Sequence, residues 1–218
     1  MVEDEQRFPP LARPRGRVCL VERRPPVLVG EKVALRMGRA DDAEAAAAHT
    51  RDNKDHLSRY SPERPTEETT PGFWLERFSK DHTEFAEDVS CRLILATASQ
   101  DRVVGSVNLF SFVRGPFQAC ILGYGIAEQE QGKGLMTEAL GLVIGYAFEE
   151  LGFHRIAANV HPDNTGSRAL MHRLDFAEEG LAQEYLLVRG AWVPHVLYSR
   201  TNPDWVGAEG SEPPAPSL

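Results

Sequence analysis

The sequence predicts a single mixed domain, α/β (mixed α+β), in which one β-sheet carries helices on its faces. Three observations predict it. Helical and strand-like patterns alternate along the chain. Three strand-like segments follow one another between residues 91 and 127, with turn signals between them. The last of these segments leads through a glycine-bearing turn into a long amphipathic segment that ends near Gly152.

The first part of the chain predicts a strand followed by two helices. Lys32–Arg39 alternates apolar and polar side chains, which is the pattern of a half-buried strand. Asp41 and Asp42 stand before the alanine-rich stretch Ala43–Thr50, so we expect a helix there with an acidic N-cap. A second helix is expected to open at Thr70-Pro71, because proline is favoured at the first helical position.

The remaining elements complete a predicted order β-α-α-β-β-β-α-β-α-β-β. Turn sequences separate the strands of the meander, and a leucine-glycine pair at residues 151–152 ends the long helix. The predicted segments are the strands Cys91–Ala98, Val103–Val113 and Phe117–Ala127, the helix Gly134–Gly152, the strand Arg155–His161, the helix Thr165–Leu174, and the hairpin strands Gly180–Arg189 and Ala191–Arg200.

Length and composition fit one domain with two tails. The chain has 218 residues, of which 42% are apolar and 26% charged, so a core of ordinary size is available. The compositions of residues 1–17 and 207–218 bury too little to offset the entropy of ordering. We expect an N-terminal tail over residues 1–26, flexible in part, a domain over 27–206, and a flexible C-terminal tail over 207–218.

Charge and cysteine usage argue against several classes of function. A net charge of -8 disfavours a nucleic-acid binder and is compatible with a basic or amine-bearing partner. The cysteines Cys19, Cys91 and Cys120 are odd in number and widely spaced, which indicates neither a disulfide framework nor a zinc site. The histidines show no metal-ligand spacing, so we expect no metal. With no signal peptide and no membrane-length apolar run, we expect a cytoplasmic monomer or homodimer.

The segment 123–140 has the features of an anion site. A strand ends there and a long helix begins, with Gly132 and Gly134 in the turn between them. Glycines let the backbone bend tightly and approach a ligand, and the first N–H groups of a helix lack partners within it. The helix dipole favours an anion at this end, and Lys133 adds a positive charge at the rim. The turn predicts a phosphate or pyrophosphate ligand, with neither Walker nor dinucleotide spacing.

The turn resembles the coenzyme A pyrophosphate signature Gln/Arg-x-x-Gly-x-Gly of the GNAT acetyltransferase superfamily, with Gln129, Gly132 and Gly134 at the matching positions. Downstream, the segment 164–176 is similar to the family's Asn-x-x-Ser…Leu-Gly-Phe segment, with Asp175 where the family has glycine. The resemblance implies that coenzyme A is bound by Gly125, Ile126, Gln129, Gln131, Gly132, Lys133, Gly134, Leu135, Asn164 and Ser167.

Other segments are similar to the ribosomal-protein-alanine N-acetyltransferases, a branch of this superfamily. They are residues 52–57, 113–126, 131–136, 184–187 and 202–205, so the resemblance spans roughly residues 27–205. It implies the GNAT fold, a central mixed, largely antiparallel twisted sheet with helices on both faces and a splayed-strand acetyl-CoA cleft. It also implies acetyl-CoA as donor and the N-terminal α-amine of an Ala- or Ser-starting ribosomal protein as acceptor.

The resemblance further implies direct attack of an amine on the thioester. Cys120 is therefore interpreted as a buried strand residue rather than a nucleophile. Backbone groups around Gly125 and Ile126 are expected to polarise the thioester carbonyl. Many relatives carry a tyrosine acid four positions beyond Ser167, where this chain has Met171, so Ser167 is the local candidate for hydrogen bonding to the departing sulfur.

Four residues are candidates for the base or the lining of the amine pocket. Glu184 lies on the strand after the cofactor elements, where relatives carry an acidic group. His161 has a suitable reference pKa, and Tyr124 and Asn108 are candidates for lining the pocket. The catalytic set expected from the sequence is Ser167, Glu184 and Tyr124.

The acceptor amine stays open between two classes, and a third class is not an enzyme. An α-amine has a reference pKa of about 7.7–8.0 against about 10.4 for lysine, so it needs only a weak base. The lack of an obvious strong base therefore favours α-amines. The alternatives are an N-acetyltransferase for a small amine (an aminoglycoside, a polyamine or an amino-acid-like compound) and a non-catalytic CoA-binding regulatory module, which the missing tyrosine at Met171 supports.

Overall fold

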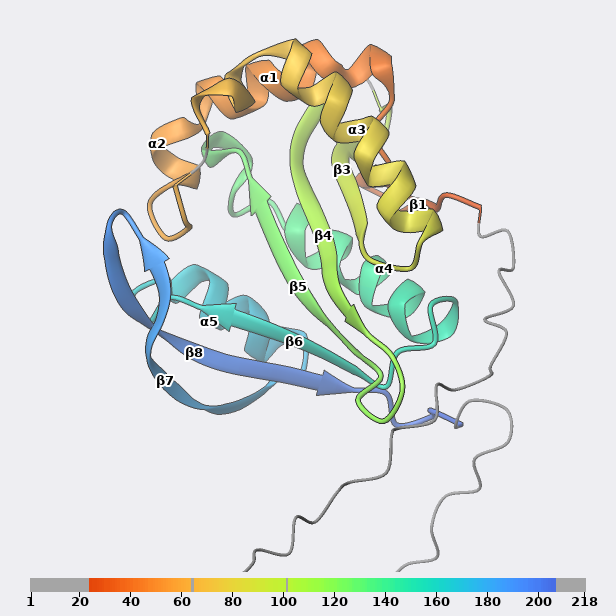
Figure 1. Cartoon of the computed structure of the whole chain (residues 1–218), viewed down its shortest axis with the longest axis vertical. Helices are drawn as coiled ribbons and strands as arrows, with labels where there is room; N and C mark the ends of the chain where they lie inside the picture. Colours follow the sequence, from red (N-terminus) through yellow and green to blue (C-terminus); the bar gives the residue numbers. More distant parts are fainter. Residues whose placement is uncertain (1–23, 64, 101, 207–218) are drawn as a thin grey trace, which may run out of the picture.

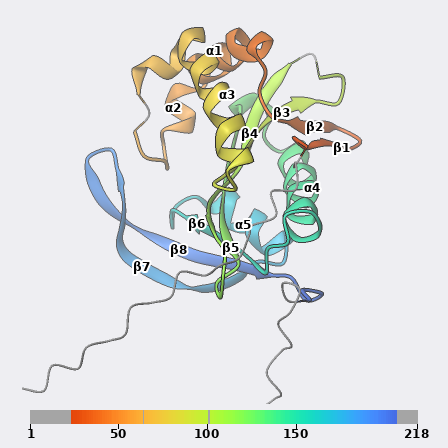
Figure 2. The same cartoon turned by 45° about the vertical axis from the view of Figure 1, so that its right-hand side comes forward.

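The computed structural model describes residues 24–63, 65–100 and 102–206, and their strands form one eight-stranded sheet in the order β1-β2-β3-β4-β5-β6-β8-β7 (Figure 1). Neighbouring strands are antiparallel except for β5 and β6, which are parallel. Helices lie on both faces of the sheet (Figure 2). The predicted fold class is confirmed. The expected tails fall almost wholly on residues 1–23 and 207–218, outside the described residues.

The elements follow the predicted order with additions at the start and in the connections. The strands are β1 (Val27–Val29), β2 (Val33–Arg36), β3 (Cys91–Thr97), β4 (Val103–Val113), β5 (Ala119–Ile126), β6 (Arg155–Val160), β7 (Ala177–Val188) and β8 (Ala191–Thr201). The helices are α1 (Ala43–Asp52), α2 (Lys54–Leu57), α3 (Pro71–Ala86), α4 (Leu135–Glu149) and α5 (Thr165–Arg173), with short 3-10 turns η1 (Ala40–Asp42), η2 (Thr66–Thr69) and η3 (Glu128–Glu130).

The sheet opens between its two parallel strands. β5 and β6 pair only at their beginnings, from Ala119 opposite Arg155 to Ile121 opposite Ala157. Beyond that point β5 stays paired with β4, and β6 stays paired with β8. The sheet is therefore two halves that are joined at one end and separate toward the carboxyl ends of β5 and β6.

The core lies mainly between the sheet and α4. Buried side chains of α4, such as Leu140 and Val143, pack against strand residues on one face of the sheet. Leu170 and Met171 of α5 extend the same core over the second half of the sheet. On the other face, α1 and α3 pack a smaller cluster that includes Phe78. The described residues include no helix that is long and apolar enough to cross a membrane.

The start of α1 differs from the sequence prediction. Asp42 is the N-cap residue of α1, as predicted, but its side chain makes no capping hydrogen bond to this helix. The carboxylate of Asp42 instead accepts two hydrogen bonds from the Arg36 guanidinium, at 2.6 and 2.7 Å. A third comes from the backbone N–H of Arg39 at 2.7 Å. A charged partner at the end of β2 outcompetes the helix amides for this carboxylate, and it ties β2 to α1.

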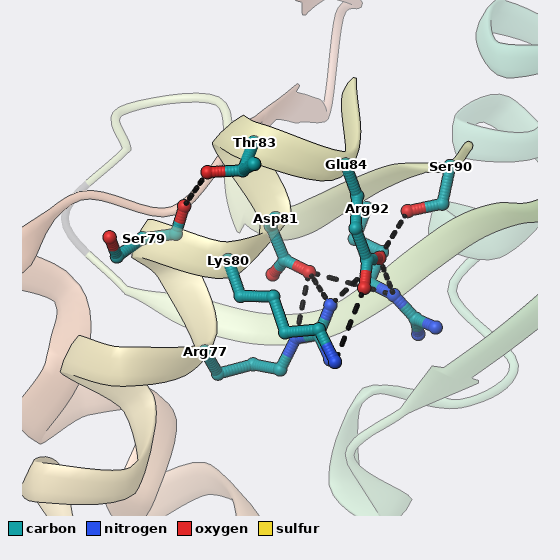
Figure 3. Close-up of polar contacts among 8 residues, drawn as sticks. All are labelled: Arg77, Ser79, Lys80, Asp81, Thr83, Glu84, Ser90 and Arg92. Carbon is teal, nitrogen blue, oxygen red and sulfur yellow. Dashed lines mark hydrogen bonds and ion pairs between the residues drawn. The ribbon is translucent and has the colours of Figure 1, made fainter. Parts of the chain in front are cut away.

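A cluster of charged side chains holds α3 against β3 (Figure 3). Asp81 is 4% exposed and accepts a hydrogen bond from Arg77 at 2.8 Å, while Arg92 of β3 lies 3.5 Å from the same carboxylate oxygen. Glu84 accepts from Arg77 at 3.0 Å and from the Ser90 hydroxyl at 2.7 Å. Burial raises the pKa of Asp81 despite its arginine partners. Burial also acts to raise the pKa of Glu84, but the hydrogen bonds from Ser90 and Arg77 lower that pKa below its usual value.

Candidate active site

The turn between β5 and α4 is shaped by two glycines with left-handed backbone. Gly132 has φ of 72° and Gly134 has φ of 79°, a region that residues with a side chain rarely adopt. Gly134 is the N-cap of α4, and no side chain caps the helix. The first amide groups of α4 are therefore left for a ligand, at the end of the helix where the dipole favours an anion.

A cavity of about 630 Å³ adjoins this turn, where β5 and β6 separate. Its walls come from α2 and the segment after it, the end of β5, the glycine turn with the first turn of α4, and α5. The residues expected from the sequence that line it are Tyr124, Gly125, Ile126, Gln131, Gly132, Gly134, Leu135, Asn164 and Ser167. The structure thus brings together the two motifs, which lie about 30 residues apart in the chain.

Three other expected site residues lie outside the lining of this cavity. Gln129 is exposed on η3. Lys133 donates to Glu130 at 2.9 Å, and Arg102 lies 2.9 Å from the other oxygen of the same buried carboxylate. Glu184 is exposed on β7 with φ of 47°, inside an irregularity of the strand. The charge of Lys133 is thus paired with the carboxylate of Glu130.

The hydroxyl groups of Tyr124 and Ser167 form a pair at the centre of the site. Their oxygens are 2.5 Å apart, joining β5 to α5 across the opening of the sheet. Burial raises the pKa of Tyr124 to about 12, so the phenol stays protonated at neutral pH. Met171, where many relatives carry tyrosine, is fully buried in the core instead. The pair offers a hydrogen-bond donor that the chain lacks at Met171.

Asn164 has a structural role in addition to the cofactor-binding role expected from the sequence. Its side-chain oxygen accepts from the backbone N–H of Ser167 at 3.1 Å, which makes it the N-cap of α5. The cap uses the oxygen and leaves the amide nitrogen, a donor of two hydrogen bonds, for a ligand in the cavity. The same bond fixes Ser167 at the start of α5, beside Tyr124.

Two cations near the N-terminus of α4 were not expected from the sequence. Arg173, at the end of α5, lines the cavity and also a second one of about 650 Å³ beside it. Lys32 lines this second cavity, and its Nζ lies 3.8 Å from where a Cβ on Gly134 would stand. Both charges suit a phosphate-bearing ligand. No local signal marks Lys32, because about 100 residues separate it from the turn.

The helix α2 forms the other wall and was also missed by the sequence analysis. Leu57 lies close against β5, with its Cδ2 3.2 Å from where a Cβ on Gly125 would stand, so a side chain there would press on Leu57. The ring of His56 lies 3.1 Å from the side-chain amide of Gln131 in the glycine turn. Tyr60 continues this wall beyond the end of α2. The helix is only four residues long, which is too short for a periodic pattern.

Both cysteines that the structure describes are free and buried. Burial raises the pKa of Cys91 and of Cys120 to about 12, so neither thiol forms a thiolate at neutral pH. In the part of the chain that the structure describes, no group of three or more histidine, cysteine, aspartate or glutamate residues is arranged to hold a metal ion.

A sheet that opens between two parallel strands, with a glycine turn at a helix N-terminus beside the opening, defines the class of this protein. The chain belongs to the GNAT acetyltransferase family, since the model of the acetyltransferase (GNAT) domain matches residues 32–177, well over half of its length. The expectation from the motifs at the turn and at residues 164–176 is thereby confirmed at the level of the family.

Individual relatives lie in the ribosomal-protein branch. The chain is 35% identical over 178 residues to the ribosomal protein uS5-alanine N-acetyltransferase of Escherichia coli (strain K12), covering 82% of this chain and 92% of that one. The ribosomal-protein-S5-alanine acetyltransferase structure from Vibrio fischeri matches with a TM-score of 0.80 at 29% identity, covering 84% of this chain and 100% of that one. RimJ of Mycobacterium smegmatis in complex with CoA-disulfide matches with a TM-score of 0.74 at 28% identity, over 81% and 86%. This protein is an N-acetyltransferase of the GNAT family, similar to ribosomal-protein acetyltransferases.

Proposed function

We propose that the protein transfers the acetyl group of acetyl-CoA to the N-terminal α-amine of a protein, of the ribosomal-protein-alanine type. The observation that carries the proposal is the single cavity that joins the glycine turn of α4 to the Tyr124–Ser167 hydroxyl pair. The turn has the chemistry for a pyrophosphate and the pair has the chemistry for a leaving thiolate. The matching structure of RimJ from Mycobacterium smegmatis is a complex with CoA-disulfide, which supports acetyl-CoA as the donor.

The proposed cofactor contacts divide between the turn and the strand. The pyrophosphate would be held by backbone groups from Gln131 to Leu135, with Gln129 and Lys133 at the edge. Arg173 and Lys32 supply positive charge beside that position. The remaining contacts, to the pantetheine arm and the thioester, would come from Gly125, Ile126 and Asn164 in the opening of the sheet.

The proposed chemistry is direct acyl transfer with balanced protons. The nitrogen of the acceptor attacks the thioester carbon, the C–N bond forms, and the C–S bond breaks. Backbone N–H groups of β5 stabilise the oxyanion, and the Tyr124–Ser167 pair donates a proton toward the leaving sulfur. An α-ammonium group loses two protons in all: one goes to a base or to solvent, and the other ends on the thiol of coenzyme A.

The proposed acceptor is an α-amine for two reasons. Its reference pKa of about 7.7–8.0 lets a weak base suffice, and the sequence offers no obvious strong base. The relative from Escherichia coli carries the name of a ribosomal-protein-alanine N-acetyltransferase. The net charge of -8 is compatible with a basic protein as acceptor.

An acceptor panel with mass detection of the product tests the proposal. Purified protein and acetyl-CoA are incubated with Ala- and Ser-starting peptides, an N-terminally blocked peptide that carries only lysine amines, a polyamine and an aminoglycoside. We expect a mass increase of one acetyl group on the unblocked peptides alone. Transfer to the small amines alone would replace the proposed acceptor with the small-molecule alternative. Tight coenzyme A binding without transfer to any amine would contradict catalysis and favour a regulatory module.

A further inference from the structure

Two histidines lie side by side on the face of the sheet opposite to the main core. Val160 of β6 pairs with Val196 of β8, and both belong to the main core under α4 and α5. Side chains alternate between the faces of a strand, so the adjacent residues His161 and His195 project to the other face. Leu57 of α2 lies on this face of β5 too.

These histidines belong to a row of four rings that leads away from the cavity. The ring of Tyr60, which lines the cavity, is 5.2 Å from that of His161 between centroids. His161 is 5.9 Å from His195, and His195 is 5.7 Å from Tyr185 of β7. The row begins in the segment after α2, crosses β6 and β8, and ends at β7. It includes no residue of the hydroxyl pair or of the glycine turn.

An irregularity between β7 and β8 places the last ring. Ala182 pairs with His195 and Leu186 with Val193, so three residues of β7 face only Pro194 of β8. Proline has no N–H to donate to a ladder, which favours a bulge at this point. The extra residues turn Tyr185 toward His195.

The hydrogen bonds of the two imidazoles set different tautomers. Nδ1 of His195 lies 3.3 Å from the carbonyl oxygen of Val193, and a carbonyl only accepts, so Nδ1 carries the proton and Nε2 has a lone pair. Nδ1 of His161 accepts from the backbone N–H of Asp163 at 3.2 Å, so its Nε2 carries the proton in the neutral ring. Of the two rings, His195 is the one with an unoccupied acceptor nitrogen.

We propose that Nε2 of His195 accepts the proton released by the incoming amine, and that Tyr60, His161 and Tyr185 form the wall of the subsite that receives this amine. The inference rests on the proposed acetyl transfer to α-amines and identifies its base. The α-ammonium group gives one proton to the imidazole, the neutral amine then attacks the thioester carbon, and the imidazolium returns its proton to solvent.

The surroundings of His195 keep the imidazole neutral. Burial lowers its pKa, the hydrogen bond to Val193 opposes that effect, and the neighbouring His161 adds to the lowering. Asp163 lies beside the row, with Oδ2 4.0 Å from Nδ1 of His161. The other titratable or charged groups along the row are Tyr185 from β7 and Tyr60 with Arg59 from the segment after α2.

The test is the pH dependence of kcat/KM for His195→Asn on an Ala-starting peptide. The asparagine amide keeps a donor for the Val193 carbonyl but has no group at Nε2. We expect a loss of about 100-fold or more at about pH 6.5, in the range typical of a general base. At about pH 9 most of the α-amine is already deprotonated, so the loss shrinks to a few-fold. His172→Asn, on the exposed face of α5, is the matched control and keeps wild-type kinetics at both pH values.

Each remaining outcome overturns the inference. Wild-type kcat/KM in His195→Asn, or a loss of equal size at both pH values, removes His195 as the proton acceptor. His161→Gln serves as a second variant of the same row, and wild-type KM for the peptide in that variant contradicts the subsite wall. A pH-dependent loss for Glu184→Gln with none for His195→Asn assigns the base to Glu184. If the wild type acetylates no peptide α-amine, the proposed function is contradicted, and this inference is contradicted with it. Binding of coenzyme A is measured independently by calorimetry.

Discussion

At the scale of single residues, the site depends on side chains that are held neutral. Burial raises the pKa of Tyr124 to about 12 and lowers that of His195, so the phenol keeps its proton and the imidazole is in its neutral form at neutral pH. The proposed proton donor and the proposed proton acceptor are thus both uncharged. The donor joins the two halves of the sheet through Ser167, and the acceptor lies on the opposite face.

The Tyr124–Ser167 pair should behave as one unit in kinetics. Tyr124→Phe and Ser167→Ala each remove one hydroxyl, and we expect kcat to fall about 100-fold in each, because the donor to the sulfur is lost or misdirected. The double variant should be scarcely slower than either single one. Single-turnover rates under saturating acetyl-CoA measure this. Losses that multiply in the double variant would mean that the hydroxyls act independently.

A site residue can be predicted from the sequence when the residues it acts with are close to it along the chain. Gly132, Gly134 and Leu135 lie in one local motif whose chemistry follows from the backbone alone. His195 and Tyr60 have no such motif, because their neighbours come from strands paired across the sheet. The register of those strands, and the bulge that turns Tyr185 inward, are set by packing over the whole molecule.

At the scale of elements, the link between β2 and α1 depends on one carboxylate. Asp42 bonds two nitrogens of Arg36 and the N–H of Arg39, and the side chains of Asp42 and Arg36 are 13% and 8% exposed. Burial acts to raise the pKa of Asp42, but the bonds from Arg36 and Arg39 outweigh it and lower the pKa. A lowered folded pKa stabilises the protein above the pKa of the unfolded chain, and this contribution is lost as the pH falls through the folded pKa.

Asp42→Asn should therefore cost stability in a pH-dependent way. We expect the free energy of unfolding to drop by about 2 kcal/mol at neutral pH, as for a lost hydrogen-bonded charge pair. The difference from the wild type should shrink toward about pH 3, where the wild-type carboxylate is being protonated as well. Urea unfolding at both pH values measures it. Asp41→Asn is the matched control, and an equal loss in that variant would contradict a specific role of Asp42.

The sequence predicts the elements that are long enough to show a periodic pattern of apolar residues. The meander of β3, β4 and β5, the helix α4 and the hairpin of β7 and β8 follow from periodicity and turn residues. β1 and α2 are three and four residues long, below that limit. β7 begins at Ala177, three residues before the expected start at Gly180, because its first residues pair with the end of β8.

At the scale of the whole molecule, the cavity is lined by residues from both halves of the sheet. The half that ends with β5 supplies Gly125 and the glycine turn, and the half that begins with β6 supplies Asn164 and α5. At this end the Tyr124–Ser167 hydrogen bond links the two halves directly. A ligand that spans from the turn to this pair would contact both halves at once.

Coenzyme A should therefore stabilise the entire domain against heat. At a concentration of about 100 times Kd, a ligand that binds only the folded state adds about 2.7 kcal/mol, which raises Tm by about 5–11 °C for a domain of this size. Differential scanning calorimetry with coenzyme A and with 3′,5′-ADP at equal concentration separates two cases. The proposed binding mode takes the pantetheine arm to the opening between β5 and β6, so we expect coenzyme A to give the larger shift at equal concentration. Equal shifts at equal concentration would mean that binding involves the glycine turn alone and leaves the two halves unlinked.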